Sequence, residues 1–277
     1  ALVVGLHNKS TGNVLNVDGG VAAAFVRWFD FIFLFCTSVM QIEKQALDRH
    51  NEKYFSSHKK KWEALKADLP NAEEIVQKLI DFQIAIPSWA LGTGGTRFGR
   101  FPGGGEPRTL EEKIEDVGLL HQLNKSSSAI SLHIPWDIPK DAKAIKILAA
   151  QHGLRFDAMN SNTFQDQKDQ THSYKFGSLQ HVDKTVRDQA IEHNLEVIEY
   201  GKQLGSTSIT VWLSDGSCFP GQLNFRKAFQ NTLDGLEKIY SALPADWKIF
   251  VEYKAFEPNF YSMTVGEWGQ SLLYAQK

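Results

Sequence analysis

From Phe82 to the C-terminus, short apolar segments alternate with longer amphipathic ones, and this alternation constrains the fold more than any other feature. The apolar segments lack the period-two polarity of a strand with one wet face, so we expect strands that are buried on both faces. Buried strands separated by helices are typical of a parallel sheet covered by helices. A doubly wound sheet and a (β/α)₈ barrel both satisfy this pattern.

Five strands and five helices are expected in this part of the chain. The strands cover residues 82–91, 128–137, 154–164, 206–213 and 247–254, and the helices cover 110–123, 140–153, 182–205, 225–243 and 265–277. Apolar stripes at helical spacing mark the third and fourth helices. The stripes are Val186, Ala190, Ile191, Leu195, Val197, Ile198 and Leu204 in the third helix, and Phe225, Phe229, Leu233, Leu236, Tyr240 and Leu243 in the fourth.

The N-terminal part divides at Met40. Residues 40–81 predict a helical extension, in which Asn71 is a candidate N-cap. The apolar segment from Gly19 to Met40 is interrupted by Arg27 and Asp30, which leaves an uncharged run too short to span a membrane. We therefore expect residues 1–39 to be a leader of doubtful origin and residues 40–277 to be one partial barrel domain, with the barrel units in 82–277.

Composition argues against several classes of partner. The formal net charge is −2, and the densest basic run, "HKKKW" from His58, is flanked by Glu52 and Glu63. This run is typical of a solvated helix face, so neither nucleic acid nor a membrane is an expected partner. The two cysteines, Cys36 and Cys218, form no recognisable disulfide framework or metal site, and a cytoplasmic setting is expected.

A glycine-rich segment, "GTGGTRFGRFPGGG", follows the first expected strand. It is not a nucleotide fingerprint, because Arg97 stands where the third glycine of G-x-G-x-x-G belongs. Pro102 and Pro107 also delay the next helix to about Thr109, whereas a phosphate cradle requires the helix to begin at once. We interpret the segment as a flexible lid.

Polar and aromatic residues gather at the ends of the expected strands. In parallel α/β folds, the carboxyl ends of the strands carry the reacting groups. Aromatic faces among hydrogen-bonding side chains suit a carbohydrate, while His133 could also be a core histidine and Trp212 could only fill a barrel. The residues are Ser88, Trp89, His133, Trp136, Asp137, Asp157, Asn160, Asn162, Trp212, Asp215, Glu252 and Lys254.

Glu252 and Lys254 form a distinct pair at the last of these strand ends. Two residues apart on a strand, they share one face. The pair fits either a structural ion pair or a site for metal ligation and carbonyl polarisation.

Several longer motifs carry a family resemblance. They are "PSWALGTGGTRFGRFPGGGEPR", "SLHIPWD", "FDAMNSNTFQD", "HSYKFGSL", "EHNLEVIEYGKQLGS", "TVWLSDGSCFPGQ" and "VEYKAFEPNFYS". Together they resemble the bacterial L-rhamnose isomerases and related sugar isomerases of the xylose isomerase-like barrel group. The resemblance runs from about Phe82 to the C-terminus and is not shared by residues 1–39. It implies an incomplete (β/α)₈ barrel with about five βα units.

The resemblance also implies an activity and its residues. It implies a metal-dependent aldose–ketose isomerase, for example of L-rhamnose, with two divalent cations, usually Mn²⁺. Glu252 would be a metal ligand, Lys254 would contact a substrate oxygen near the reacting carbons, and His133 would assist ring opening. The apolar walls would be Trp89, Trp136, Phe164 and Trp212. Phe98 would close over a neighbouring subunit's site, which implies a homo-oligomer, a tetramer in the complete enzyme.

The pattern departs from the family at its end. The remaining ligands that the family pattern requires, aspartates and histidines on later strands, are not found before Lys277. We therefore expect a fragment that neither turns over rhamnose nor binds Mn²⁺ tightly, because a lone Glu252 cannot hold two cations. A sugar epimerase or an endonuclease-like member of the same barrel group, and a non-catalytic carbohydrate-binding fragment, are the alternatives.

Overall fold

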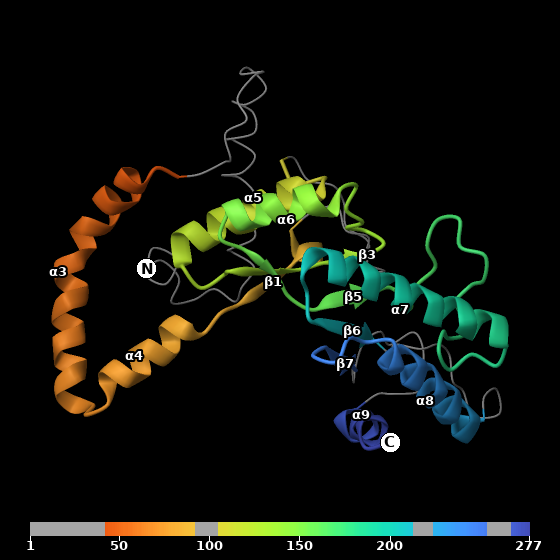
Figure 1. Ribbon diagram of the computed structural model, residues 1–277. Coiled ribbons are helices and arrows are strands. Elements are labelled where there is room, and N and C mark those ends of the chain that lie inside the picture. The colour runs from red at the N-terminus through yellow and green to blue at the C-terminus, as the bar shows by residue number, and fades with distance from the viewer. Residues whose placement is uncertain (1–41, 92–104, 213–223, 254–266) are drawn as a thin grey trace, which may run out of the picture. The chain divides into compact units, whose positions relative to one another are not determined.

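The computed structural model describes residues 42–91, 105–212, 224–253 and 267–277 (Figure 1). The leader, the centre of the glycine loop with Phe98, and Lys254 lie outside the described residues, as do Asp215 and both cysteines. In chain order the elements are α3 (Lys44–Asp68), α4 (Ala72–Asp81), β1 (Ala85–Pro87), the 3₁₀ helix η1 (Ser88–Ala90), α5 (Leu110–Asn124), β2 (Ala129–Ser131), β3 (His133–Ile134), α6 (Ala142–Gln151), β4 (Arg155–Phe156), β5 (Met159–Ser161), α7 (Lys184–Leu204), β6 (Ser208–Trp212), α8 (Phe225–Ser241), β7 (Lys248–Glu252) and α9 (Trp268–Ala275).

The order of the strands decides between the two architectures. One sheet has the order β3-β5-β6-β7, and every pairing in it is parallel. The second has the order β1-β2-β4, so neighbours in both sheets follow the order of the chain. A doubly wound sheet reverses its strand order at a switch point, and neither sheet does so. The parallel α/β class is confirmed, and the winding is that of part of a (β/α)₈ barrel.

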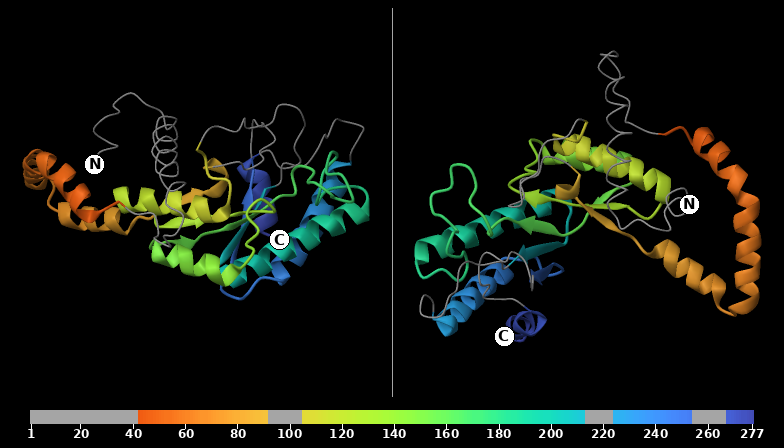
Figure 2. Two further views of the ribbon diagram at one scale, coloured as in Figure 1. Left: turned by 90° about the horizontal axis from the view of Figure 1, so that it is seen from above. Right: turned by 180° about the vertical axis from the view of Figure 1, so that it is seen from behind.

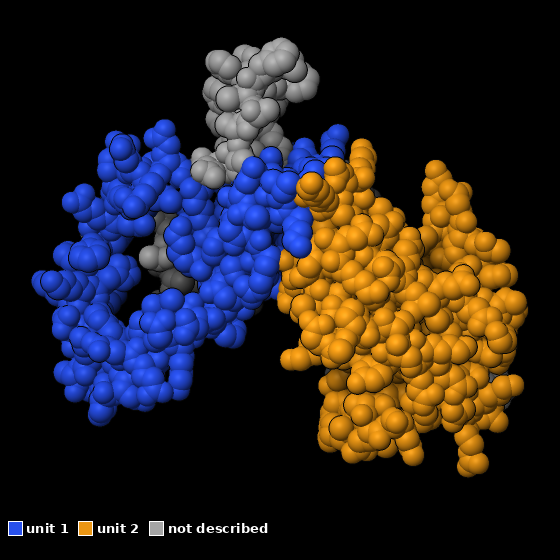
Figure 3. Space-filling model, in the orientation of Figure 1, with its two compact units in different colours: residues 1–130, 144–155 blue, residues 131–143, 156–277 orange. Residues whose placement is uncertain are grey.

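The chain forms two compact units (Figure 3). The first comprises residues 1–130 and 144–155, and the second comprises 131–143 and 156–277. In the first unit, Thr109 caps α5 in a capping box: its side chain accepts from Glu112 N, and the Glu112 carboxylate accepts from Thr109 N, both at 3.2 Å. This exchange satisfies two backbone donors that have no partner within the helix.

The helical extension is confirmed as α3 and α4. Asn71 occupies the cap position of α4, but its side chain makes no capping hydrogen bond, so the predicted capping contact is wrong. Lys66 of α3 instead pairs with Glu73 in the first turn of α4, with 3.0 Å between nitrogen and oxygen. None of the described helices is long and apolar enough to cross a membrane.

In the second unit, alternate residues of the strands serve two different faces of the sheet. Met159 and Ile209 are paired in register and fully buried, and α7 packs against both of their strands. α7 and α8 lie side by side, as the views in Figures 1 and 2 agree. His133 is paired with Asn160, and Asn160 with Thr210, so these three residues point to the opposite face. The helices therefore leave that face of the sheet to the candidate site.

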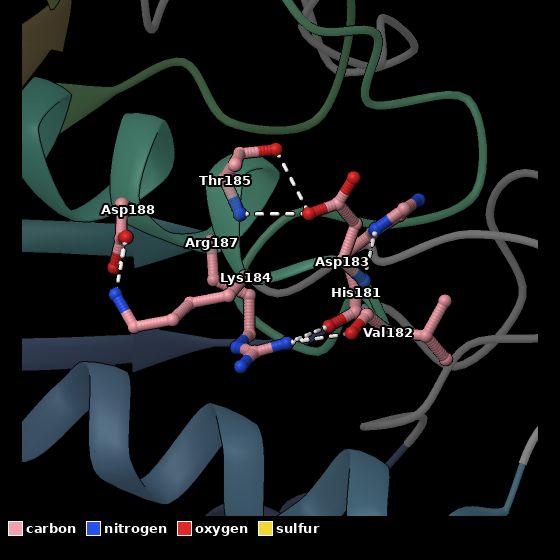
Figure 4. A network of polar contacts seen from close by, with 7 residues as sticks. All are labelled: His181, Val182, Asp183, Lys184, Thr185, Arg187 and Asp188. Carbon is pink, nitrogen blue, oxygen red and sulfur yellow. Dashed lines mark hydrogen bonds and ion pairs between the residues drawn. The ribbon is translucent and has the colours of Figure 1, made fainter.

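The start of α7 is fixed by its own side chains (Figure 4). Asp183 accepts hydrogen bonds from the backbone nitrogen and the hydroxyl of Thr185, at 2.9 and 2.8 Å. These bonds hold the pKa of the Asp183 carboxyl below its usual value, because they favour the charged form. Arg187 donates to the carbonyls of His181 and Val182, which ties the first turn to the preceding loop. At the other end Gly205, with φ of 88° in the left-handed region, ends the helix.

The predicted buried face of α8 is partly wrong. Phe225 and Tyr240, which the apolar stripe included, are 49% and 65% exposed. The buried face is formed by Ala228, Asn231, Thr232, Leu233, Gly235, Leu236 and Ile239. Small and polar residues occupy it because the loop before α7 packs closely there. Asn231 Nδ2 donates to the carbonyls of Gln180 and His181 in that loop.

Candidate active site

Four predicted residues meet at the carboxyl ends of three strands. We call His133, Trp136, Phe164 and Trp212 the aromatic cluster. The His133 ring is stacked on Trp136, with centroids 4.0 Å apart and planes inclined by 19°. Phe164 meets the His133 ring edge-on at 5.7 Å and lies 4.2 Å from Trp212. The strand-end rule had singled out His133, Trp136 and Trp212, and the family resemblance had added Phe164; the roles of all four toward a substrate stay predictions.

The turn after β3 holds His133 and Trp136 in this stacked position. The backbone nitrogen of His133 donates to Asp137 Oδ2 at 2.9 Å, and the backbone nitrogen of Asp137 donates to the His133 carbonyl at 2.9 Å. Asp137 is only 2% exposed, so its carboxylate helps to form the turn. Both bonds close the same five-residue turn, so they fix the backbone from which the His133 and Trp136 rings project.

Glu252 lies beside the aromatic cluster in the sheet. It ends β7, is half-buried, and is the register partner of Trp212. Register partners in a parallel sheet point to the same face, so the carboxylate and the indole face the same side. Glu252 is therefore in the place that a substrate or metal ligand would require. The structure does not bear on its role, which stays a prediction.

One other strand-end prediction is wrong, that of Asp157, and a second residue, Asn160, makes hydrogen bonds within the sheet. Asp157 lies before β5, and its carbonyl accepts from Ser206 Oγ before β6, so it stands at the amino ends of the strands. Asn160 is on the expected face, but its side-chain nitrogen donates to the carbonyls of Leu132 and Ala158 at 3.1 Å each. The prediction for Asp157 failed because two short strands, β4 and β5, replace the single strand expected there. Asn160 stabilises the backbone of the sheet through its two hydrogen bonds.

A run of buried polar residues follows Asn160. Ser161, Asn162 and Thr163 are at most 1% exposed. Within the described part of the chain, the Ser161 and Thr163 hydroxyls and both polar atoms of the Asn162 side chain have no hydrogen-bond partner. Buried polar groups are normally satisfied, by protein, water or ligand. This run therefore marks the end of β5 as a place where further hydrogen bonds are available.

His193 on α7 belongs to this region, and the sequence did not indicate it. Its Nε2 lies 3.1 Å from the backbone nitrogen of Asn162 and 3.2 Å from the carbonyl oxygen of Ile134. Its Nδ1 lies 3.5 Å from Glu196 Oε2. Burial lowers the pKa of His193 below its ordinary value, and the Glu196 carboxylate opposes this shift only in part. Burial therefore favours the neutral form of the imidazole.

The loop after Phe164 is held to α7 by two hydrogen bonds. Gln189 of α7 accepts from the backbone nitrogen of His172 and donates to its carbonyl, both at 3.0 Å. Within the loop, Asp166 accepts from Tyr174 N and Ser173 Oγ, both at 2.6 Å. These bonds at both ends restrict the loop that carries Phe164 into the aromatic cluster.

The other predicted site residues are not part of the aromatic cluster. Trp89 lies in η1 of the first unit and is half-buried, and its part in a substrate site stays a prediction. Phe98 and Lys254 lie outside the described residues. Within residues 42–91, 105–212, 224–253 and 267–277, no three His, Cys, Asp or Glu side chains converge to hold a metal ion. The described residues thus do not make up the expected two-cation site.

Comparison with known proteins supplies relatives by sequence. The chain is 55% identical over 205 residues to a probable sugar isomerase of Rhizobium meliloti (strain 1021) and, equally, to one of Mesorhizobium japonicum. The match covers 74% of this chain but only 48% and 47% of the two relatives. The chain therefore spans about half the length of the curated relatives it matches. No family model matches the sequence.

Comparison of folds gives weaker similarity. A D-allulose 3-epimerase from Methylomonas sp., solved in complex with D-allulose, aligns with 70% of this chain and 58% of its own. The two are 13% identical, and the TM-score is 0.49. An L-ribulose 3-epimerase aligns over 70% of this chain with a TM-score of 0.47. Neither score supports an argument about function, and the fold rests on the strand order described above.

Proposed function

We propose that the protein is the strand-one to strand-five part of a sugar isomerase that interconverts an aldose and a ketose, with L-rhamnose as the expected substrate. The observation that carries the proposal is the 55% identity, over 205 residues, to two proteins named probable sugar isomerases. The aromatic cluster supports it independently, because it offers flat apolar surfaces next to hydrogen-bonding groups. Sugars present apolar C–H faces edged with hydroxyls, and such a surface is complementary to them.

In this proposal Trp136, Phe164 and Trp212 bind the sugar, whereas His133 takes part in the reaction. Trp136 and Phe164 cover the apolar face of the sugar, and Trp212 closes the pocket beside Glu252. His133, held by its turn and by Trp136, bonds a sugar hydroxyl and moves a proton at the ring oxygen as the ring opens. Glu252 and, as the family resemblance implies, Lys254 would act at the carbons between which hydrogen is transferred. Trp89 and, from a neighbouring subunit of the expected tetramer, Phe98 complete the apolar wall.

The metal requirement is a separate part of the proposal. Divalent cations, when bound, would polarise the sugar carbonyl and hydroxyl, and Mn²⁺ suits oxygen ligands such as Glu252. Since the described residues alone do not make up such a site, we assign no step of the reaction to the cations. Calorimetric titration of this chain with Mn²⁺ should show no tight binding; tight binding that is lost in Glu252→Gln would show that the chain completes a site by itself.

Sugar binding tests the proposal on the chain as it stands. Saturation-transfer NMR with L-rhamnose should show contact with the wild-type protein and its loss in Trp136→Ala. Trp268→Ala is the matched control, because Trp268 is 66% exposed and lies on α9, which contributes no residue to the aromatic cluster. Equal signals in the wild type and in both variants would show that the aromatic cluster is not the binding surface.

Catalysis is tested in a chimera in which the matched residues of this chain replace their counterpart in the Rhizobium meliloti relative. We expect the chimera to convert L-rhamnose into a ketose, and His133→Ala to abolish the conversion. An epimer in place of a ketose would identify the epimerase alternative. Sugar binding without turnover, in a chimera whose parent is active, would favour the carbohydrate-binding alternative.

A further inference from the structure

We propose that His193 is a positioning residue, which holds the turn carrying His133 and Trp136 at a fixed distance from the segment carrying Phe164. Its link to sugar chemistry rests on the proposed function, whereas its structural effect does not. The residue stands on α7, outside every strand end, and touches no member of the aromatic cluster in any described contact. It acts through two backbone groups.

The two backbone groups belong to the ends of neighbouring strands. Ile134 ends β3 and precedes the turn of Trp136 by two residues, while Asn162 follows β5 and precedes Phe164 by two. A single atom, His193 Nε2, lies 3.2 Å from the oxygen of the first and 3.1 Å from the nitrogen of the second. The position of this ring therefore sets the spacing between the two strand ends that carry the aromatic cluster.

The protonation state of the ring fixes which bond forms. The Glu196 carboxylate beside Nδ1 favours the tautomer with hydrogen on Nδ1, which leaves the Nε2 lone pair free to accept. Nε2 then accepts from the Asn162 N–H and carries no hydrogen for the Ile134 carbonyl oxygen, so the contact with Ile134 is a close approach without a hydrogen bond, which limits how near the Ile134 backbone can lie. The ring is 15% exposed, so few water molecules can replace it in this contact.

α7 itself is held firmly enough to serve as the base for this contact. Gly201, two turns after His193, is packed so closely that an added Cβ would lie 2.9 Å from Met159 Cγ of β5. Nearer the start of the helix, Gln189 holds the His172 backbone with two hydrogen bonds. Because α7 is held in place on both sides of His193, the position of the imidazole relative to the two strand ends is fixed.

The experiment compares His193→Phe with His193→Gln in ¹⁵N-labelled protein. Phe keeps the ring volume but has no acceptor, while the Gln carbonyl oxygen can still accept from Asn162 N. We expect amide exchange of Asn162 to become about fivefold to tenfold faster in His193→Phe, as loss of one hydrogen bond allows, and to stay near wild type in His193→Gln. The indole signals of Trp136 and Trp212 should shift in the Phe variant only.

His58→Phe is the matched control, since His58 is exposed on α3. Unchanged Asn162 exchange and unchanged indole signals in a folded His193→Phe variant would overturn the proposal. Should that variant fail to fold, the ¹⁵N shift of Nε2 in the wild type decides: a protonated Nε2 at pH 7 contradicts the acceptor role, and an unprotonated one supports it. These readouts need no sugar, so they stand even if L-rhamnose does not bind.

With sugar present, the same variants report on function. His193→Phe should weaken binding of L-rhamnose about tenfold or more, because displaced Trp136 and Phe164 side chains would lose contacts with the sugar. His193→Gln should restore most of it. Wild-type binding that His193→Phe leaves intact would contradict the positioning role, whereas absence of binding in the wild type would contradict only the proposed function.

Discussion

Replacing Gly201 by alanine tests how α7 is seated on the sheet. A Cβ at this position would lie 2.5 Å from Trp247 Cη2 and 2.9 Å from Met159 Cγ, where carbon atoms in contact prefer about 3.5 to 4.0 Å. Trp247 is 9% exposed and Met159 is fully buried, so neither side chain has free space to enter. The backbone cannot yield easily either, because the Gly201 carbonyl accepts from both Gly205 and Ser206.

Two opposing contributions set the magnitude. Overpacking a close-packed core costs about 1 to 3 kcal/mol. Alanine in place of glycine within a helix contributes up to about 1 kcal/mol of stability. We therefore expect Gly201→Ala to lower the free energy of unfolding by about 1 kcal/mol, with a range from about zero to 2.

Gly235→Ala is the matched control. Gly235 also lies in a helix, α8, but the one tight contact of its added Cβ would be with the terminal Cδ2 of Leu179, at 3.1 Å, while Cβ and Cγ of Leu179 would lie at an ordinary 3.7 Å. A methyl group at the end of a side chain can move by a few tenths of an ångström, so the gain in helix propensity should prevail. This variant should be as stable as the wild type or more stable, by up to about 1 kcal/mol.

Urea denaturation followed by circular dichroism measures both variants. Trp247→Phe removes the outer ring atoms that the new Cβ would meet, so Gly201→Ala should cost less in that background, and the double-mutant cycle should show the coupling. If Gly201→Ala proves as stable as Gly235→Ala, the reasoning is refuted, because the close approach of α7 to the sheet would then not exist in solution.

Three further predictions follow from other contacts. Burial lowers the pKa of His121, His152 and His193 below the ordinary 6.5, so the unfolded chain binds more protons than the folded chain below that pH. In urea titrations the free energy of unfolding should therefore be steady above about pH 6.5 and fall toward pH 5. A flat profile would contradict these pKa shifts. Thr109→Ala should lower the free energy of unfolding by about 1 kcal/mol through loss of the capping box of α5, while Thr109→Ser should not. Asp166→Ala should speed amide exchange of Tyr174, whose N–H the carboxylate accepts, and unchanged exchange would show that the loop is held by other means.

The sequence predicted most of the fold because periodicity reports burial. The five helices from residue 110 onward and the strands between them were found near their expected positions, and the stripe of α7 is buried at Val186, Ala190, Val197 and Leu204. The same method failed on α8, where side-chain apolarity pointed to Phe225 and Tyr240. It failed there because the packed face is chosen by close approach, which Gly235 and Asn231 permit and large apolar residues do not.

The candidate site was predictable to the extent that strand geometry determines it. Parallel strands deliver their carboxyl-end residues to one edge, so His133, Trp136 and Trp212 could be grouped without coordinates, whereas Phe164 was named only through the family resemblance. Choosing between the two architectures required the strand order, which periodicity does not contain. The roles of Glu252 and Lys254 depend on contacts that the fold does not by itself provide.

His193 could not have been found in this way, and the reason is physical. The atoms that it contacts are a backbone carbonyl and a backbone N–H, which almost every residue possesses. The residue types at these strand ends therefore do not predict the contact. The one sequence signal was its position between Ile191 and Asn194, two buried residues of α7, which places a titratable ring against the sheet. In this chain, therefore, the proposed positioning residue would be sought among polar residues beside the buried stripe of α7, and not among the residues of the strands.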